Sequence, residues 1–266
     1  MPLGFSSLRH AAAFLDVVRL AAQGASAGVF FDGAHGVACD EAQELSGLDL
    51  VERQLFMDAQ HVVFRRAFSD LVHAGKYPVL STTIGFDGIG AQVPWGNDCP
   101  RAEEALLNAL AGVPFARNNE FWMWNLGDLA SRQILNAIEE ADRGVPTMVH
   151  MPYFPEDGGC LEGCWTPEDR RVWFGEEEFL EFGMAAFLVS MGPGSYFGFS
   201  DMQTDAEGGG WFDVSWPYYE QYDTVVTGAP LGPATVSEDA MVFHRSFDNG
   251  EVSVNVAEGT YRIDLR

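Results

Sequence analysis

Basic residues are scarce in this chain, and their scarcity limits the ligands it can bind. Lys and Arg number 15 against 39 Asp and Glu, which gives a formal net charge of −24 at pH 7. A surface of that sign repels the phosphate groups of nucleic acids and of anionic lipids. The composition therefore argues against nucleic-acid binding and against attachment to membranes.

Cysteine is scarce as well. Four cysteines in 266 residues are too few for a disulfide scaffold. Cys160 and Cys164 form a C-x3-C pair, but no second Cys or His pair follows at zinc spacing, so we expect no metal site. The sequence leaves open whether these two, with Cys39 and Cys99, are disulfide-bonded or free.

Long apolar runs and cofactor motifs are also missing. The longest uncharged apolar stretch, residues 182–191, is far too short to span a bilayer, and residues 11–15 predict an amphipathic helix rather than a signal-peptide core. Neither a Walker loop nor a dinucleotide fingerprint is present, so we expect no cofactor. Residues 194–198 lack the G-x-S-x-G spacing of serine esterases.

Strand-like and helix-like segments alternate along most of the chain. The expected strands are residues 28–31, 77–83, a segment around Glu120 that ends near Trp124, 145–151 and 195–200. The expected helices are residues 6–23, 51–71, 102–110, 128–142 and 176–190, and Gly75 and Gly144 are predicted to end two of them. Strands joined by such long crossovers predict a parallel sheet.

The positions of polar residues favour a (β/α) TIM-type barrel over a doubly wound sheet. Barrel enzymes carry their sites at the carboxyl ends of the strands. Polar residues stand at those ends here, namely Asp32, Thr83, Glu120, His150 and Asp201. Only five strand-helix units are found, so we expect a barrel that is incomplete at its N-terminus and leaves an open sheet edge.

The pattern changes near the C-terminus. Residues 242–247 and 251–256 alternate apolar and polar residues around the turn Asp248-Asn249-Gly250, which predicts a β-hairpin, and residues 261–265 predict a third strand. We therefore expect a barrel domain over residues 1–225 and a small β appendage over residues 226–266.

The C-terminal segments resemble a family of glycosyl-hydrolase-like TIM barrels. Residues 228–235 (GAPLGPAT), 242–247 (VFHRSF) and 248–255 (DNGEVSVN) are similar to the segments that follow the last barrel strand in that family. The strand Phe30-Phe31-Asp32 resembles its aspartate-bearing middle strand. The match extends over most of residues 28–265 and implies glycosidase-like chemistry and an extracellular location, but the family's early barrel strands are absent.

If the barrel forms, Asp32 and Glu120 are the expected catalytic pair, one as nucleophile or base and the other as general acid. The separation of the two carboxyl groups would decide between a retaining and an inverting reaction. The expected substrate-binding residues are His150, Tyr153, Trp122, Trp124, Asp201 and Trp95. The alternative interpretation is that Asp32 caps a turn and that Glu120 pairs with Arg117 or points outward.

Two functions therefore remain open. The first is a glycoside hydrolase that acts on a polysaccharide or glycan, and the second is a degenerate, inactive barrel that binds carbohydrate or serves a structural role. Aromatic residues make up 13% of the chain, and several Trp residues fall in predicted loops, where a ring can stack on a sugar. The same composition also suits a core rich in Phe.

Overall fold

The computed structural model describes residues 8–31, 50–81, 107–119, 123, 127–153, 176–204, 211–215, 218–225 and 228–265. The chain forms two compact units. Unit 1 comprises residues 1–84 and 93–118, and unit 2 comprises residues 85–92 and 119–266. The protein is a mixed α/β protein in which parallel strands alternate with helices, followed by a separate antiparallel sheet.

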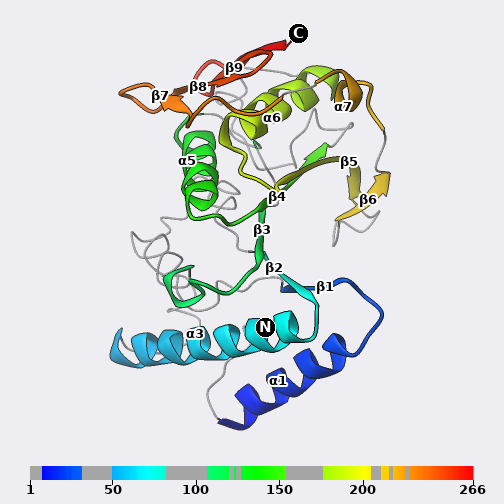
Figure 1. Ribbon diagram of the computed structural model, residues 1–266, viewed down its shortest axis with the longest axis vertical. Helices are drawn as coiled ribbons and strands as arrows, with labels where there is room; N and C mark the ends of the chain where they lie inside the picture. Colours follow the sequence, from blue (N-terminus) through cyan, green and yellow to red (C-terminus); the bar gives the residue numbers. More distant parts are fainter. Residues whose placement is uncertain are drawn as a thin grey trace. The chain divides into compact units, whose positions relative to one another are not determined.

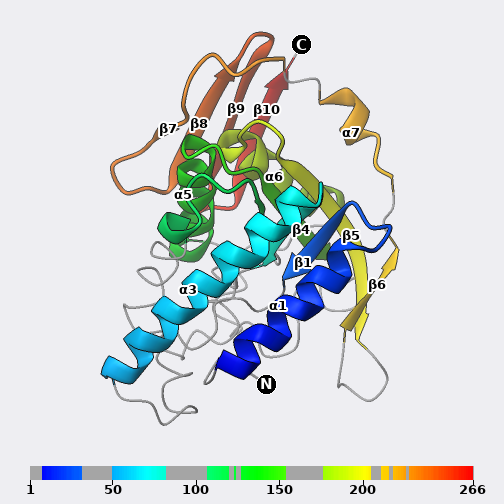
Figure 2. The same cartoon turned by 60° about the horizontal axis from the view of Figure 1, so that its bottom comes forward.

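Unit 1 contains parallel strands that pair in chain order. Its elements are α1 (Leu8–Ala22), β1 (Gly28–Phe31), α3 (Leu50–His73), β2 (Tyr77–Ser81) and β3 (Ala116–Asn119, of which the last residue is grouped with unit 2). β2 pairs with β1 on one side and with β3 on the other, both in parallel. The helices α1 and α3 lie side by side (Figure 2).

A cluster of phenylalanine rings joins the two helices of unit 1 to its strands. The ring of Phe31 on β1 lies 6.0 Å from that of Phe14 on α1 and 4.9 Å from that of Phe68 on α3. Phe64 on α3 contacts the same three rings. Edge-on and tilted ring pairs of this kind stabilise a core beyond the area they bury. This cluster fixes one face of β1 against the helices.

Glycines end two helices as the sequence predicts. Gly75 adopts a φ of 71° after α3, and Gly144 a φ of 73° after α5 (Asp128–Asp142). After each glycine, an amide reaches back to the last turn, since Lys76 N donates to Leu71 O (2.9 Å) and Val145 N to Glu140 O (2.9 Å). This is the Schellman geometry, which turns each chain directly into the next strand.

Unit 2 continues the alternation and then reverses direction. Its first elements are α5, β4 (Thr147–Tyr153), α6 (Glu176–Ser190), β5 (Tyr196–Thr204), β6 (Trp211–Ser215) and α7 (Gln221–Thr224). β4 and β5 are parallel, whereas β6 pairs with β5 antiparallel, and the register shifts between Asp201 and Met202.

The C-terminal segment forms a four-stranded antiparallel sheet. Its strands are β7 (Thr235–Val236), β8 (Val242–Phe247), β9 (Gly250–Asn255) and β10 (Thr260–Leu265), in the order β10-β9-β8-β7. The expected hairpin is confirmed, with Phe247 opposite Gly250 across the turn. The expected third strand is confirmed as β10, and β7 was not predicted.

Helix α6 lies between this sheet and the parallel strands of unit 2 (Figure 1). From Phe179 to Ser190 every residue of α6 except Glu181 is buried. A helix that is apolar nearly all round needs partners on more than one side. Val252 and Val254 of β9 pack in the same core as Met151 of β4, with α6 residues between them. Glu181 also contacts the sheet, since Tyr261 Oη of β10 donates to Glu181 Oε2 (2.6 Å).

Most expected elements agree with the structure within a few residues, but β3 ends at Asn119, before Glu120. The strands β4 and β5 continue past His150 and Asp201, which were expected at their ends, to Tyr153 and Thr204. Residues 107–109 are helical, within the expected helix 102–110. The antiparallel strand β6 was not expected. The four cysteines lie outside the described residues, and the boundary between domains at residue 226 stays a prediction. No helix in the described part of the chain has the length and apolarity needed to cross a membrane.

Candidate functional site

The parallel strands of unit 2 have two different faces. Side chains alternate along a strand, so the buried Val149, Met151 and Tyr153 of β4 share the face that packs against α6. His150 projects from the other face, which we call the second face. On β5, Phe199 shares the α6 side and Ser200 the second face.

His150 and Ser200 contact each other on this second face. His150 Nε2 lies 2.7 Å from Ser200 Oγ. The register aligns Pro152 with Ser200, so the two polar side chains come from adjacent strands, two positions apart. Ser200 is fully buried and His150 is half-buried. A hydrogen bond to one ring nitrogen restricts the orientation of the imidazole.

The other predicted residues of β4 and β5 lie differently. Tyr153 is 8% exposed, and its ring lies 6.0 Å from that of Phe179 and 5.9 Å from that of Phe199, on the α6 side of the strands. The backbone of Asp201 pairs with Tyr153 and stands at the register shift of β5. Irregularities of this kind are frequent beside active sites because they redirect side chains. The structure thus brings His150 together with Ser200, not with Tyr153.

In unit 1 the strand β3 is unusually polar for a buried parallel strand. Arg117, Asn118 and Asn119 follow one another and are exposed by 7% or less. Strands of parallel sheets are normally near-continuous apolar runs. Arg117 aligns with Leu80 and so lies on the helix-covered face. Asn118 aligns with Ser81 at the carboxyl end of β2 and lies on the opposite face, which we call the second face of unit 1. Buried polar groups need hydrogen-bond partners, so the end of β3 is not an ordinary apolar strand of the core.

Sequence reasoning missed the polar end of β3 and the contact between His150 and Ser200. It gave Arg117 only as a partner for Glu120, and it did not select Ser200, Asn118 or Asn119. The signal available for the asparagines was their place next to Glu120 at a strand end. The Ser200 contact had no sequence signal because the register between β4 and β5 cannot be read from the chain.

Several predicted site residues lie outside the described part of the structure. These are Asp32, Glu120, Trp95, Trp122 and Trp124. In the sequence, Asp32 directly follows β1 and Glu120 directly follows β3. Their assignment to catalysis and substrate binding stays a prediction.

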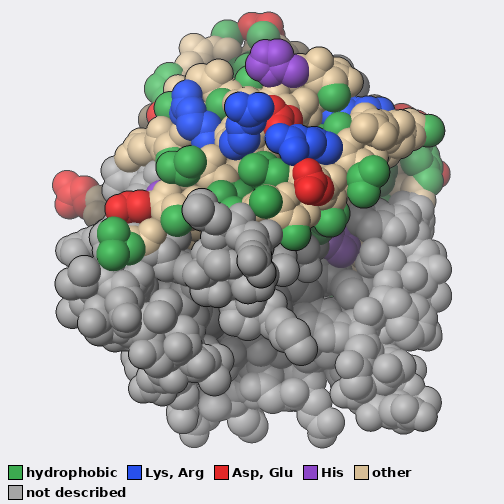
Figure 3. Space-filling view, turned by 90° about the horizontal axis from the view of Figure 1, so that it is seen from below, with side chains coloured by type: hydrophobic (Ala, Val, Ile, Leu, Met, Phe, Trp, Pro, Cys, Tyr) green, Lys and Arg blue, Asp and Glu red, His purple; other side chains and the backbone are tan. Residues whose placement is uncertain are grey.

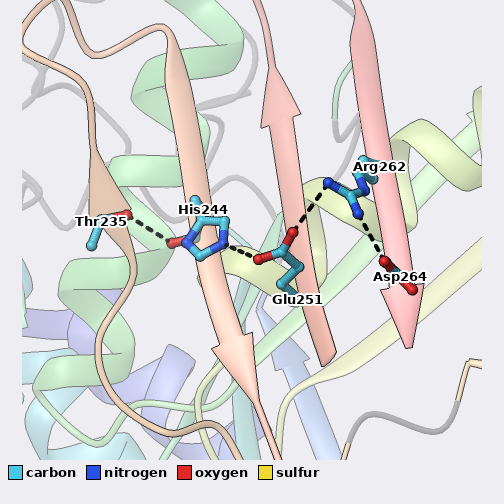
Figure 4. Close-up of polar contacts among 5 residues, drawn as sticks. All are labelled: Thr235, His244, Glu251, Arg262 and Asp264. Carbon is cyan, nitrogen blue, oxygen red and sulfur yellow. Dashed lines mark hydrogen bonds and ion pairs between the residues drawn. The ribbon is translucent and has the colours of Figure 1, made fainter. Parts of the chain in front are cut away.

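The C-terminal sheet has a polar outer face of a different kind (Figure 4). Glu251 lies between His244 and Arg262, with Oε2 at 3.2 Å from His244 Nε2 and Oε1 at 3.2 Å from Arg262 Nη1. Arg262 Nη2 also pairs with Asp264 Oδ2 at 2.8 Å. These side chains are 37 to 62% exposed, so water competes for every contact. This network has the features of a solvated surface.

Within the described ranges, no three His, Cys, Asp or Glu side chains are grouped closely enough to hold a metal ion. Comparison with known proteins gives no family for this chain, because no protein-family model and no curated protein matches its sequence.

Proposed function

We propose that this protein is a glycoside-hydrolase-like enzyme that cleaves glycosidic bonds of a polysaccharide or glycan with Asp32 and Glu120. The observation that carries the proposal is the placement of polar side chains on the second face of the parallel strands. His150 and Ser200 meet there in unit 2, and Asn118 lies on the second face of unit 1. Hydrogen-bonding side chains on this face suit the hydroxyl groups of a sugar, although His150 and Ser200 lie in the middle of β4 and β5 rather than at their carboxyl ends.

The proposed architecture is a (β/α) TIM-type barrel that is incomplete at its N-terminus, with a C-terminal β appendage. Two observations support it. Within each unit the parallel strands pair in chain order, and the helices between them pack on one face of the strands. Crossovers between neighbouring parallel strands are nearly always right-handed, and their repetition builds barrels. The resemblance of the C-terminal segments to glycosyl-hydrolase-like barrels points to the same architecture.

The proposed chemistry needs two carboxyl groups in different protonation states. One, ionised, attacks the anomeric carbon or activates water, and the other, protonated, donates its proton to the leaving oxygen. A separation of about 5 to 5.5 Å gives retention and about 6.5 to 9.5 Å gives inversion. The sequence neighbours Phe121, Trp122 and Trp124 are apolar and would favour the neutral form of Glu120 as the acid.

The remaining residues would bind the sugar. His150, oriented by Ser200, would hydrogen-bond a sugar hydroxyl, and Trp95, Trp122 and Trp124 would provide apolar ring surfaces. Asp201, at the register shift within β5, would bind a second hydroxyl. Tyr153 would act through the packing of β4 and β5 that positions His150, because its ring lies on the α6 side.

A second candidate is an inactive protein that binds carbohydrate. The observation in its favour is that β1 stands at the end of its strand order and that Phe30, on its second face, is 50% exposed. A barrel with an open interior loses the dry environment that glycosidic cleavage requires. This alternative predicts glycan binding without turnover.

The test is the release of reducing sugar from a polysaccharide panel by the wild type, Asp32→Asn and Glu120→Gln. We expect each substitution to lower turnover by at least about 100-fold, because each removes one half of the acid-base pair. Asp16→Asn and Glu258→Gln, which alter exposed acidic residues elsewhere, control for the loss of one charge.

Wild-type turnover that survives both substitutions would exclude Asp32 and Glu120 from catalysis. Glycan binding by calorimetry with no turnover in any variant would establish the second candidate instead.

A further inference from the structure

The strands at the ends of the two strand orders differ in how they are protected from pairing with another chain. β10 carries Arg262 and Asp264, β6 carries Asp213, and β7 has only two residues. Charges and short length are the usual devices that prevent edge-to-edge association. β1, with the sequence Gly-Val-Phe-Phe, has four residues and no charge. Among the described strands it is the edge best suited to association.

The backbone direction of β1 identifies the groups that face its outer edge. Tyr77 N donates to Ala27 O (3.0 Å), so the carbonyl of Ala27 points toward β2. Backbone groups alternate in direction along a strand, so those of Val29 and Phe31 also point toward β2. The N–H and C=O groups of Gly28 and Phe30 therefore point toward the outer edge.

We propose that β1 pairs antiparallel with β1 of a second copy of this chain, which makes the protein a two-fold symmetric dimer. With the axis at Val29, Gly28 exchanges two hydrogen bonds with Phe30 of the partner subunit, and Phe30 exchanges two with the partner's Gly28. Residues directly opposite each other lie on the same face. Each half-exposed Phe30 ring thus covers the partner's Gly28, which has no side chain.

The glycine itself is required by the fold, which makes this complementarity a fixed property of the edge. A Cβ atom at Gly28 would lie 2.3 Å from the carbonyl oxygen of Tyr77 on the neighbouring strand. No other residue fits there without moving β2. Position 28 must therefore remain glycine, next to the exposed ring of Phe30.

Helix α1 adds an apolar surface beside the same edge. Arg19 reaches Asp70 of α3 (3.8 Å), so that side of α1 faces α3. Val17 lies about 160° round the helix from Arg19 and so points away from α3. It is 63% exposed. The two-fold axis is perpendicular to the plane of the sheet and therefore keeps both copies of α1 on the same face. The two Val17 side chains then approach each other.

The charge distribution favours association through unit 1. Unit 1 holds eight of the 15 Lys and Arg residues but only twelve of the 39 Asp and Glu residues. Figure 3 shows basic, acidic and apolar side chains intermixed on the described part of this surface. Contact through this nearly balanced unit keeps most acidic side chains out of the interface, where like charges would repel. This inference is independent of the proposed glycosidase activity.

Sedimentation velocity of the full chain over a concentration series tests the dimer. We expect a reversible dimer with a dissociation constant on the order of micromolar, since a four-residue strand and one helix make a small interface. Phe30→Pro removes an outward N–H and leaves the β1–β2 ladder intact, so it should raise the dissociation constant at least about tenfold.

A matched pair of helix variants keeps the test independent of that proline. Val17→Glu should weaken the dimer, whereas Val62→Glu, on α3 and similarly exposed at 69%, should leave it unchanged. Val29→Cys tests the register, because oxidation should join the two copies through position 29. A wild type that stays monomeric at 100 times the predicted dissociation constant would overturn the proposal. Equal dimerisation of the Val17 and Val62 variants would also overturn it.

Discussion

The second face of β4 and β5 and the outer face of the C-terminal sheet are both polar, but they hold their polar groups differently. Ser200 is fully buried and contacts one half-buried imidazole at 2.7 Å. Glu251 is 44% exposed and is shared between His244 and Arg262 at 3.2 Å each. The first contact is shielded from water, whereas water competes for the contacts of the second.

The difference indicates which of the two polar faces is the better candidate for a functional site. An exposed ion pair contributes about 0 to 1 kcal/mol and is screened by salt. A buried hydrogen bond costs about 1 to 3 kcal/mol when one partner is removed. The polar pair between β4 and β5 is therefore a better candidate for a specific role than the ion pairs of the outer face.

The largest expected effect concerns the opposite, inner face of the C-terminal sheet. Phe243 is fully buried against α6, so Phe243→Ala should lower the free energy of unfolding by about 3 to 5 kcal/mol. Its neighbour Val242 projects from the outer face and is 39% exposed, so Val242→Ala should cost less than about 1 kcal/mol. Denaturant unfolding of both variants measures the contrast. Similar losses would mean that the outer face is covered.

An intermediate effect is expected on the second face of β4 and β5. Ser200→Ala should cost about 1 to 2 kcal/mol, because the imidazole of His150 loses a close hydrogen-bond partner. Ser253→Ala, on the outer face of the C-terminal sheet, should cost less than about 0.5 kcal/mol. Denaturant unfolding gives the stabilities, and the histidine ¹⁵N chemical shifts report the tautomer of His150. Unchanged shifts in Ser200→Ala would show that Ser200 does not orient this ring.

The smallest effect is expected at the charged network. Glu251→Gln should lower stability by no more than about 0.5 kcal/mol, because water replaces its two exposed partners. The difference from wild type should disappear at 1 M salt, where the screening length falls to about 3 Å. Thermal unfolding at two salt concentrations measures this. A loss above about 2 kcal/mol that persists in salt would contradict the comparison.

Much of the local structure could be predicted because local physics determines it. Gly75 and Gly144 ended their helices as expected, since both adopt the left-handed conformation that glycine favours. The turn at Asn249-Gly250 placed the hairpin correctly. The apolar run from Phe182 onward was recognised, and its burial on all sides explains why it shows no helical periodicity.

Long-range pairing could not be predicted in the same way. Strand β6 returns antiparallel beside β5, and nothing in its five residues identifies that partner. Tyr153 was expected at the site, but the two-residue period of β4 puts it on the face of Met151, against α6. This error could have been avoided, because the alternation is present in the sequence and distinguishes Tyr153 from His150. The contact of His150 with Ser200 also needs the register of β5, which only the folded structure supplies.

Arg245 links the end of α6 to the C-terminal sheet. Its Nη1 atom donates to the carbonyl oxygen of Met191 (2.6 Å), just after the helix, while its Nε atom donates to Gly232 O (3.2 Å). A cation at this position also interacts favourably with the negative end of the helix dipole. The last turn of α6 is thus completed by a residue made much later in synthesis. Amide hydrogens of that turn and of β8 should accordingly exchange with solvent at a common rate, as one cooperative opening unit.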